Sequence, residues 1–253
     1  MFLPRSRIAL AGLCLALLAG CASNRTLTTG SIPDYSAMPR EEALGAVGQL
    51  GERYRANPNE RWVIVNYAAA LRAQGQAGQA AAVLEAGLRA HPRDVEINTA
   101  YAKALTAEGR FEQALNVLDN VIRPDAPDWN ALSVRGAVLD QLGRHAEARQ
   151  LYLQAQVLAP HEPGVVANLG LSYLMTRDLP QAERYLRQAA QMPGATSQVR
   201  QNLALVVGLQ GRFSEAEALY ARELPAEEVT ANMAYVRAML SQPNRWDSLA
   251  SSG

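Results

Sequence analysis

Few side chains in this sequence could carry chemistry of their own: two cysteines, three histidines and a single lysine. Thiolates act as nucleophiles and metal ligands, and imidazoles act as general acids and bases. Cys14 and Cys21 both lie near the start of the chain, whereas His91, His145 and His161 are scattered at expected turns. No Gly-x-Ser-x-Gly elbow, phosphate loop, dinucleotide fingerprint or His-Glu-x-x-His motif occurs. We therefore predict no catalytic residue, no metal site and no enzyme activity.

Cys21 is the residue whose surroundings point to a reaction. It follows a basic pair, Arg5 and Arg7, and an apolar stretch of 12 residues from Ile8 to Ala19. A helix of that length is too short to cross a bilayer core of about 30 Å, and the length is typical of the core of a secretory signal peptide. Cys14 lies inside this core, where it serves as an ordinary apolar residue.

The run Leu18, Ala19, Gly20 and Cys21 resembles the lipobox of bacterial lipoproteins. That resemblance implies that residues 1–20 are a signal peptide, and that Cys21 receives a diacylglycerol on its sulfur and an acyl chain on its new amine. Several acyl chains anchor a protein firmly, whereas one gives marginal binding. The alternative is an ordinary secretory signal whose small residues precede a cysteine. We expect no cofactor other than this covalent lipid.

The residues after Cys21 bear on where the protein resides. Ala22 follows the cysteine, and similar lipoproteins without aspartate at that place are usually sent to the outer membrane. The resemblance therefore implies a body in the periplasm, facing inward from the outer membrane. Residues 21–39 are rich in Ser, Thr, Gly and Pro and carry no helical spacing of apolar residues, so we predict a flexible tether there.

The composition favours a folded protein and disfavours nucleic acid as a partner. The 253 residues are 49% hydrophobic and 19% charged, which is ordinary for a globular chain. The 24 basic residues balance the 24 acidic residues, so the chain lacks the one-signed field that nucleic acid partners require. We expect neither a nucleic acid partner nor a small-molecule substrate.

Small residues return every 34 positions along most of the chain, and this period is the strongest pattern in the sequence. One such column consists of Ala80, Ala114, Ala148, Ala182 and Ala216. A second column, of Ala68, Ala102, Gly136, Gly170 and Ala204, predicts close approach of paired helices. Glycines form a third at Gly75, Gly109, Gly143 and Gly211, where a left-handed turn would end a helix, and Arg177 takes this place in the fourth unit. Each 34-residue unit carries two amphipathic helical patterns, so we predict stacked helical hairpins.

These columns resemble the tetratricopeptide repeat over residues 59–228, as five full units. The resemblance implies an all-α superhelical solenoid of about 12 antiparallel helices. Flanking helices are expected at residues 40–58 and, as a C-terminal cap, at residues 229–241. We expect residues 242–253 to form a disordered tail.

In this repeat family the first helix of each unit lines an inner groove that usually holds a peptide or a helix. The resemblance implies that the groove wall here includes Val65, Ala69, Thr99, Lys103, Ser133, Ala137, Asp140, Leu171, Leu174, Met175, Gln201 and Leu205. Members that bind a free C-terminal carboxylate do so with several lysines and asparagines. A chain with one lysine does not fit that ligand.

Two groups of groove residues each have two interpretations. Asn66, Asn168 and Asn202 occupy equivalent places, where they either bind the backbone of an extended peptide or join neighbouring helices. The second group is apolar and consists of Leu171, Leu174 and Met175. It forms either a patch for an amphipathic partner or part of the core between helices.

The layout of a lipobox followed by a helical array resembles the repeat lipoproteins of the tight-adherence (Flp) pilus assembly system and, more loosely, the pilotins of type IV pili. This resemblance implies a periplasmic scaffold that supports the outer-membrane secretin, with the secretin or another pilus component as its protein partner. One alternative is an adaptor that scaffolds peptidoglycan hydrolases or other envelope enzymes. A second is an enzyme whose site carries no motif.

Overall fold

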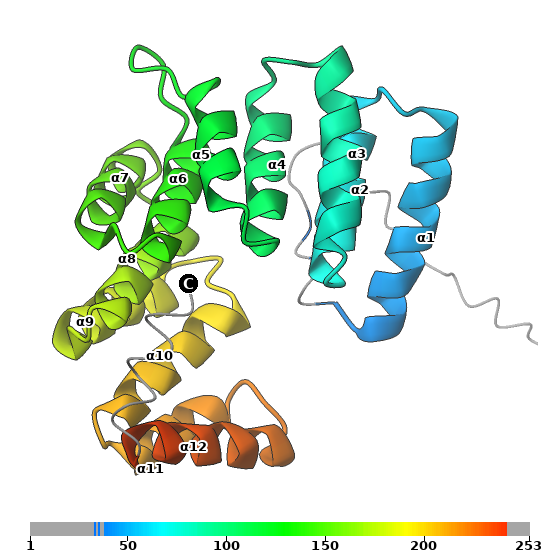
Figure 1. Cartoon of the computed structure of the whole chain (residues 1–253). Helices are drawn as coiled ribbons and strands as arrows, with labels where there is room; N and C mark the ends of the chain where they lie inside the picture. Colours follow the sequence, from blue (N-terminus) through cyan, green and yellow to red (C-terminus); the bar gives the residue numbers. More distant parts are fainter. Residues whose placement is uncertain (1–32, 34, 36–37, 242–253) are drawn as a thin grey trace, which may run out of the picture. The chain divides into compact units, whose positions relative to one another are not determined.

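In the computed structural model, the described part of the chain comprises residues 33, 35 and 38–241, which belong to one compact unit. This part contains twelve α-helices and no strand (Figure 1), which confirms the all-α prediction. The helices are α1 Arg40–Ala56, α2 Arg61–Ala73, α3 Ala77–Ala90, α4 Val95–Ala107, α5 Phe111–Asp119, α6 Trp129–Gln141, α7 His145–Leu158, α8 Pro163–Met175, α9 Leu179–Gln191, α10 Ser197–Leu209, α11 Phe213–Tyr220 and α12 Ala226–Ser241. The predicted signal peptide, lipobox and tail lie outside the described residues.

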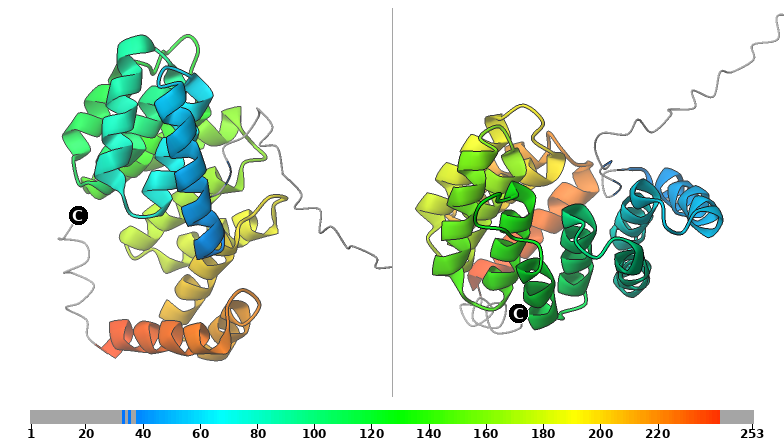
Figure 2. Two further views of the ribbon diagram at one scale, coloured as in Figure 1. Left: turned by 90° about the vertical axis from the view of Figure 1, so that its right-hand side faces the viewer. Right: turned by 90° about the horizontal axis from the view of Figure 1, so that it is seen from above.

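The helices pack as antiparallel hairpins in chain order. Helices α2–α3, α4–α5, α6–α7, α8–α9 and α10–α11 form five pairs, and each first helix also contacts the first helix of the next pair. The first helices α2, α4, α6, α8 and α10 therefore share one continuous layer. Helix α1 packs on α2, and α12 packs on both α10 and α11 (Figure 2), so each end of the array is covered.

The repeated small residues have the roles that their columns predict. The five alanines of the first column are 0% exposed, namely Ala80, Ala114, Ala148, Ala182 and Ala216. A Cβ atom added at Gly136 would lie 2.7 Å from the ring of Tyr152, and one at Gly170 would lie 2.9 Å from Leu186 Cγ. Paired helices thus approach more closely at these positions than a larger side chain permits.

The turn glycines adopt left-handed backbone, with φ between 72° at Gly75 and 81° at Gly211. Arg177 takes the same conformation with φ of 61°. This left-handed conformation costs a residue with a Cβ atom roughly 1–2 kcal/mol. The fourth unit therefore keeps the turn geometry of the others although it lacks their glycine.

The second unit departs from the first and the third at its end. Helix α5 has 9 residues, whereas α3 and α7 each have 14. Pro124 and Pro127 lie between α5 and α6, where a missing backbone donor would break a continuing helix. Asp128 then caps α6 by accepting a hydrogen bond from the backbone of Ala131 at 2.8 Å. The prolines thus shorten one helix and leave the order of hairpins unchanged.

A charged network joins the fourth unit to the fifth. Glu183 Oε1 on α9 lies 2.7 Å from Arg187 Nη2 and 2.5 Å from Arg212 Nη2. Gln210 Nε2 donates to Glu183 Oε2 at 2.8 Å. Desolvation alone would raise the pKa of Glu183, but the hydrogen bonds from these three donors outweigh it and lower that pKa from its ordinary 4.5 to about 2.

We expect Glu183→Gln to lower the free energy of unfolding by about 1 to 2 kcal/mol at pH 7. A carboxyl whose pKa is depressed on folding adds stability above its unfolded pKa and loses it as the pH falls through the folded value. The difference between wild type and variant should therefore shrink as the pH falls from 4.5 to about 2. Urea titrations at several pH values measure it. Glu217→Gln, at an exposed position of α11, is the control and should change stability little at any pH.

Candidate protein-binding face

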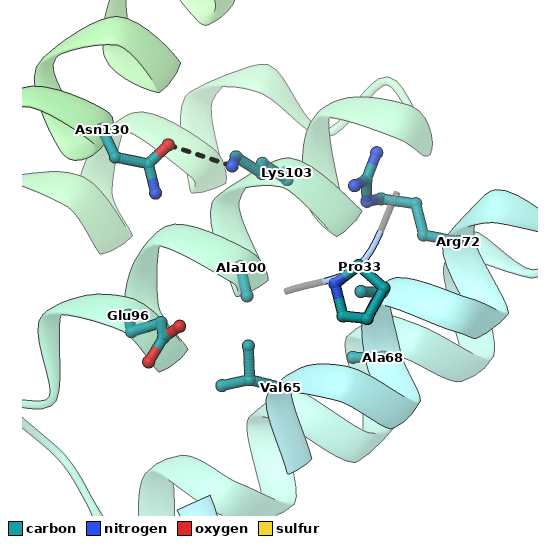
Figure 3. Close-up of a pocket in the computed structure, with 9 residues that line it drawn as sticks. Pro33, Val65, Ala68, Arg72, Glu96, Ala100, Lys103 and Asn130 are labelled. Atoms are coloured by element: carbon teal, nitrogen blue, oxygen red, sulfur yellow. Dashed lines mark hydrogen bonds between the residues drawn. The ribbon is translucent and has the colours of Figure 1, made fainter. Parts of the chain in front are cut away.

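A cavity of about 230 Å³ opens on the layer of first helices (Figure 3). Its lining comes from α2, α4 and α6 and from the segment that precedes α1. The lining residues are Pro33, Val65, Ala68, Ala69, Arg72, Glu96, Ala100, Lys103 and Asn130. The predicted groove residues Val65, Ala69 and Lys103 therefore meet at one site.

The polar side of this cavity carries charges of both signs. Lys103 Nζ donates to Asn130 Oδ1 at 3.0 Å, across the gap between α4 and α6 (Figure 3). Burial lowers the pKa of the Lys103 ammonium from 10.5 to about 8, and the nearby charge of Arg72 adds to the shift. Glu96 supplies a carboxylate, which Arg61 Nη2 approaches to 2.6 Å.

The remaining wall of the cavity is apolar and made of small side chains, from Val65, Ala68, Ala69 and Ala100. Such a surface lets an extended backbone approach closely while charged groups at its rim bind polar atoms. A nucleophile aligned with a base is not among the lining residues. The arrangement suits binding of a polypeptide.

Tyr35 packs onto this face although it lies in the predicted tether. Its ring is 3% exposed in an apolar cluster with Leu50 of α1 and Ala70 of α2. Its hydroxyl donates to Asn66 Oδ1 at 3.1 Å. Burial raises the pKa of that hydroxyl from 10.0 to about 12. This end of the segment is therefore packed, in contrast to the expectation of a free tether through residue 39.

Three predicted wall residues are buried between helices. Thr99, Ser133 and Asp140 are 1%, 5% and 4% exposed. Asp140 accepts hydrogen bonds from Tyr152 Oη at 2.9 Å and from Ser172 Oγ at 2.8 Å, and its Oδ1 lies 2.8 Å from His145 Nδ1. Asp140 therefore joins α6, α7 and α8, and the prediction that it faces a ligand does not fit this geometry. His145, which the sequence places at a turn away from any predicted site, is one of its partners.

The three equivalent asparagines have different partners. Asn66 accepts from Tyr35, whereas Asn168 Nδ2 donates to Ser133 Oγ on the preceding first helix at 3.1 Å. Asn202 Oδ1 accepts from Gln198 Nε2 on its own helix at 3.0 Å. Asn168 thus fits the interpretation that asparagine joins neighbouring helices. Binding of a peptide backbone by these residues stays a prediction.

The apolar end of the predicted wall divides between core and surface. Leu174 and Leu205 pack against the buried clusters of the last two units. Met175 is 38% exposed. Three others are partly buried, namely Ala137, Leu171 and Gln201, and Gln201 Nε2 donates to Ser197 Oγ at 3.0 Å. The patch proposed for Leu171, Leu174 and Met175 is therefore smaller than its three members suggest.

Sequence reasoning missed Arg72, Glu96 and Asn130, and the repeat contained a signal for Arg72. Arg72 lies two steps of 34 residues before Asp140, which was placed on the wall. Glu96 and Asn130 are one step apart and occupy equivalent places in successive units. Extending the column of Asp140 and Leu174 to the first unit would have found Arg72. Glu96 and Asn130 lie in a column without a predicted wall residue, and Pro33 and Tyr35 lie outside the repeat.

Two further features of the described residues bear on function. No helix among them is both long enough and apolar enough to traverse a bilayer. Within the same part of the chain, no three or more His, Cys, Asp or Glu side chains gather in a way that could hold a metal ion.

Three family models match the sequence, and each describes a tetratricopeptide repeat (TPR). They cover residues 71–135, 129–154 and 168–229, which together amount to more than half of the chain. The chain belongs to the tetratricopeptide repeat family. TPR proteins generally act as scaffolds that bind other proteins, and none of the three models describes a catalytic domain. No match to a curated protein was found.

Solved structures of other TPR proteins share this fold. A thermophilic TPR protein from Thermus thermophilus has a TM-score of 0.61 and 21% identity, over 69% of this chain and 97% of that one. PilW, a widely conserved type IV pilus biogenesis factor, has a TM-score of 0.59 and 13% identity, over 78% and 91%. PilF of Pseudomonas aeruginosa has a TM-score of 0.51 and 19% identity, over 85% and 99%. At these identities the likeness establishes the TPR fold alone.

Proposed function

We propose that this TPR protein is a lipid-anchored scaffold of the outer membrane that faces the periplasm and supports the secretin of a pilus machine, in the manner of a pilotin. The observation that carries the proposal is a cavity on the layer of first helices, in an array preceded by the lipobox-like Leu18, Ala19, Gly20 and Cys21. An array held at a membrane by acyl chains can place a bound partner there. Its chemistry offers docking and no reaction.

Similar layouts support the choice of a pilus machine. The arrangement of lipobox, tether and repeats resembles TadD, the TPR lipoprotein of the tight-adherence (Flp) pilus assembly system. PilW, a type IV pilus biogenesis factor, and PilF both share the fold over most of their lengths. In this proposal the inner face holds a segment of the secretin, and the lipid on Cys21 directs the complex to the outer membrane.

Replacement of the anchor residue tests the proposal. We expect Cys21→Ser to move the protein out of outer-membrane fractions and to reduce secretin multimers there at least fivefold, because a secretin without a placed scaffold assembles poorly. Cys14→Ser is the matched control, because it changes the other cysteine without touching the lipobox. Immunoblots of fractionated membranes measure both proteins, and mass spectrometry detects the acyl mass.

Three outcomes would count against this function. Unchanged secretin multimers in the Cys21→Ser strain would remove the pilotin-like role. Copurification with a peptidoglycan hydrolase, together with normal pili, would favour the adaptor role. A mature protein without acyl mass would remove the anchor itself.

A further inference from the structure

We propose that the inner face of α2 is a binding site for a short peptide segment, and that the chain's own Pro33 and Tyr35 occupy it in cis. The two residues form a turn, in which Tyr35 N donates to Pro33 O at 3.0 Å. A partner segment must then displace them to bind. The kind of partner that fits is a peptide segment with proline and tyrosine two residues apart that forms the same turn. This inference concerns the array itself and holds whichever envelope machine the protein serves.

The contacts of Tyr35 are those of a bound ligand more than those of a linker. Tyr35 precedes α1, so no helix holds it in place, yet its side chain is 3% exposed. Its ring shares an apolar cluster with Leu50 and Ala70, and its hydroxyl finds a partner in Asn66, which is itself 2% exposed. Asn66 also donates to Trp62 O at 2.9 Å, which fixes the orientation of its amide. The site thus holds both the ring and the hydroxyl of a tyrosine.

Pro33 shows how the site continues beyond the tyrosine. It lies at the edge of the cavity on α2 and α4, beside Val65 and Ala68 (Figure 3). On the far side of the same cavity are Lys103 and Asn130. These polar groups offer further contacts to a partner segment that continues beyond its proline.

Attachment to the same chain gives the cis segment an advantage over a free peptide. A short linker holds a tethered ligand at an effective concentration in the millimolar range. A free segment of equal intrinsic affinity therefore binds poorly while Tyr35 is docked. Removal of the Tyr35 side chain should free the site, and a partner with extra contacts at Lys103 could displace it without any mutation.

Peptide binding to the full chain, purified in detergent, tests this inference. The probe is a fluorescein-labelled peptide of residues 30–39, and fluorescence anisotropy reports its binding. We expect the peptide to bind at least tenfold more tightly to Tyr35→Ala than to wild type. Adding Asn66→Ala to that variant should weaken binding several-fold, and a peptide with alanine in place of its tyrosine should bind poorly to every form.

Matched variants separate an open site from a damaged one. Tyr235→Ala removes a tyrosine that is 49% exposed on α12, and it should leave peptide binding at the wild-type level. Circular dichroism checks that each variant keeps its helices. If Tyr35→Ala loses them, Tyr35→Phe serves in its place, because it keeps the ring and lacks only the hydroxyl; its binding should exceed that of wild type. Equal binding to wild type and the folded opened variant, or no binding to that variant, would overturn the inference.

Discussion

Replacement of Asp140 by alanine should lower the free energy of unfolding by about 3 to 5 kcal/mol. Asp140 lies on α6 and is 4% exposed, and its carboxylate binds groups from α7 and α8. Tyr152 and Ser172 are both buried, and without the carboxylate their hydroxyls lose their acceptor. Each buried donor left unsatisfied costs roughly 1–3 kcal/mol. Burial raises the pKa of Tyr152, with Asp140 adding to the shift, so its hydroxyl remains a donor at working pH.

Two milder variants separate the hydrogen bonds from the packing. Asp140→Asn keeps the volume and one acceptor oxygen, and it should cost less than the alanine variant. Tyr152→Phe removes one donor and leaves the carboxylate with its other partners, at a cost of about 1 kcal/mol. Urea denaturation followed by circular dichroism measures all three. A loss below about 1 kcal/mol for Asp140→Ala would mean that the network does not hold the third and fourth units together.

Gly170→Leu should lower the free energy of unfolding by more than about 3 kcal/mol, because α8 and α9 would have to separate. A Cβ atom at Gly170 would lie 3.2 Å from the carbonyl oxygen of Ala182 and 3.3 Å from the backbone nitrogen of Leu186. Backbone atoms within a helix cannot move aside as a flexible side chain can. The gain of about 1 kcal/mol from replacing a helical glycine offsets only part of this cost.

Gly48→Leu is the matched control for this substitution. Gly48 also lies within a helix, α1, but a Cβ atom there would meet nothing within 4 Å. We expect this variant to be as stable as wild type or slightly more stable. Thermal unfolding of both variants measures the difference. Equal effects at the two positions would show that helix propensity, rather than close approach of α8 to α9, governs the small column.

The repeat made most of the fold predictable. A 34-residue period fixes which residues are equivalent, so one well-marked unit indicates the helices and turns of all five. The burial of the alanine column and the left-handed backbone of Gly75 and Gly211 follow from that equivalence. Helix lengths were harder to predict where prolines interrupt the repeat pattern between two units, as after α5.

The candidate site was less predictable because equivalent positions need not have equivalent surroundings. Arg72, Asp140 and Leu174 share one column but have different roles. Arg72 lines a cavity, Asp140 joins three helices, and Leu174 packs into the core. The three positions differ in the side chains that the adjacent helices place beside them. Tyr35 lies outside the repeat, so the period carries no information about its contact with Asn66. Cys21 lies outside the described residues, and its lipidation stays a prediction.

The short helix α5 has a mechanical consequence. In a linear stack each unit resists separation only through the faces that it shares with its neighbours. Helix α5 ends at Asp119, and of the second helices that adjoin a following unit it packs least extensively on the next first helix. Arg135 and Asp119 form an ion pair across this junction at 2.5 Å, with both side chains partly exposed to solvent. A load applied between the two ends of the array would therefore concentrate its yielding at the junction of the second and third units.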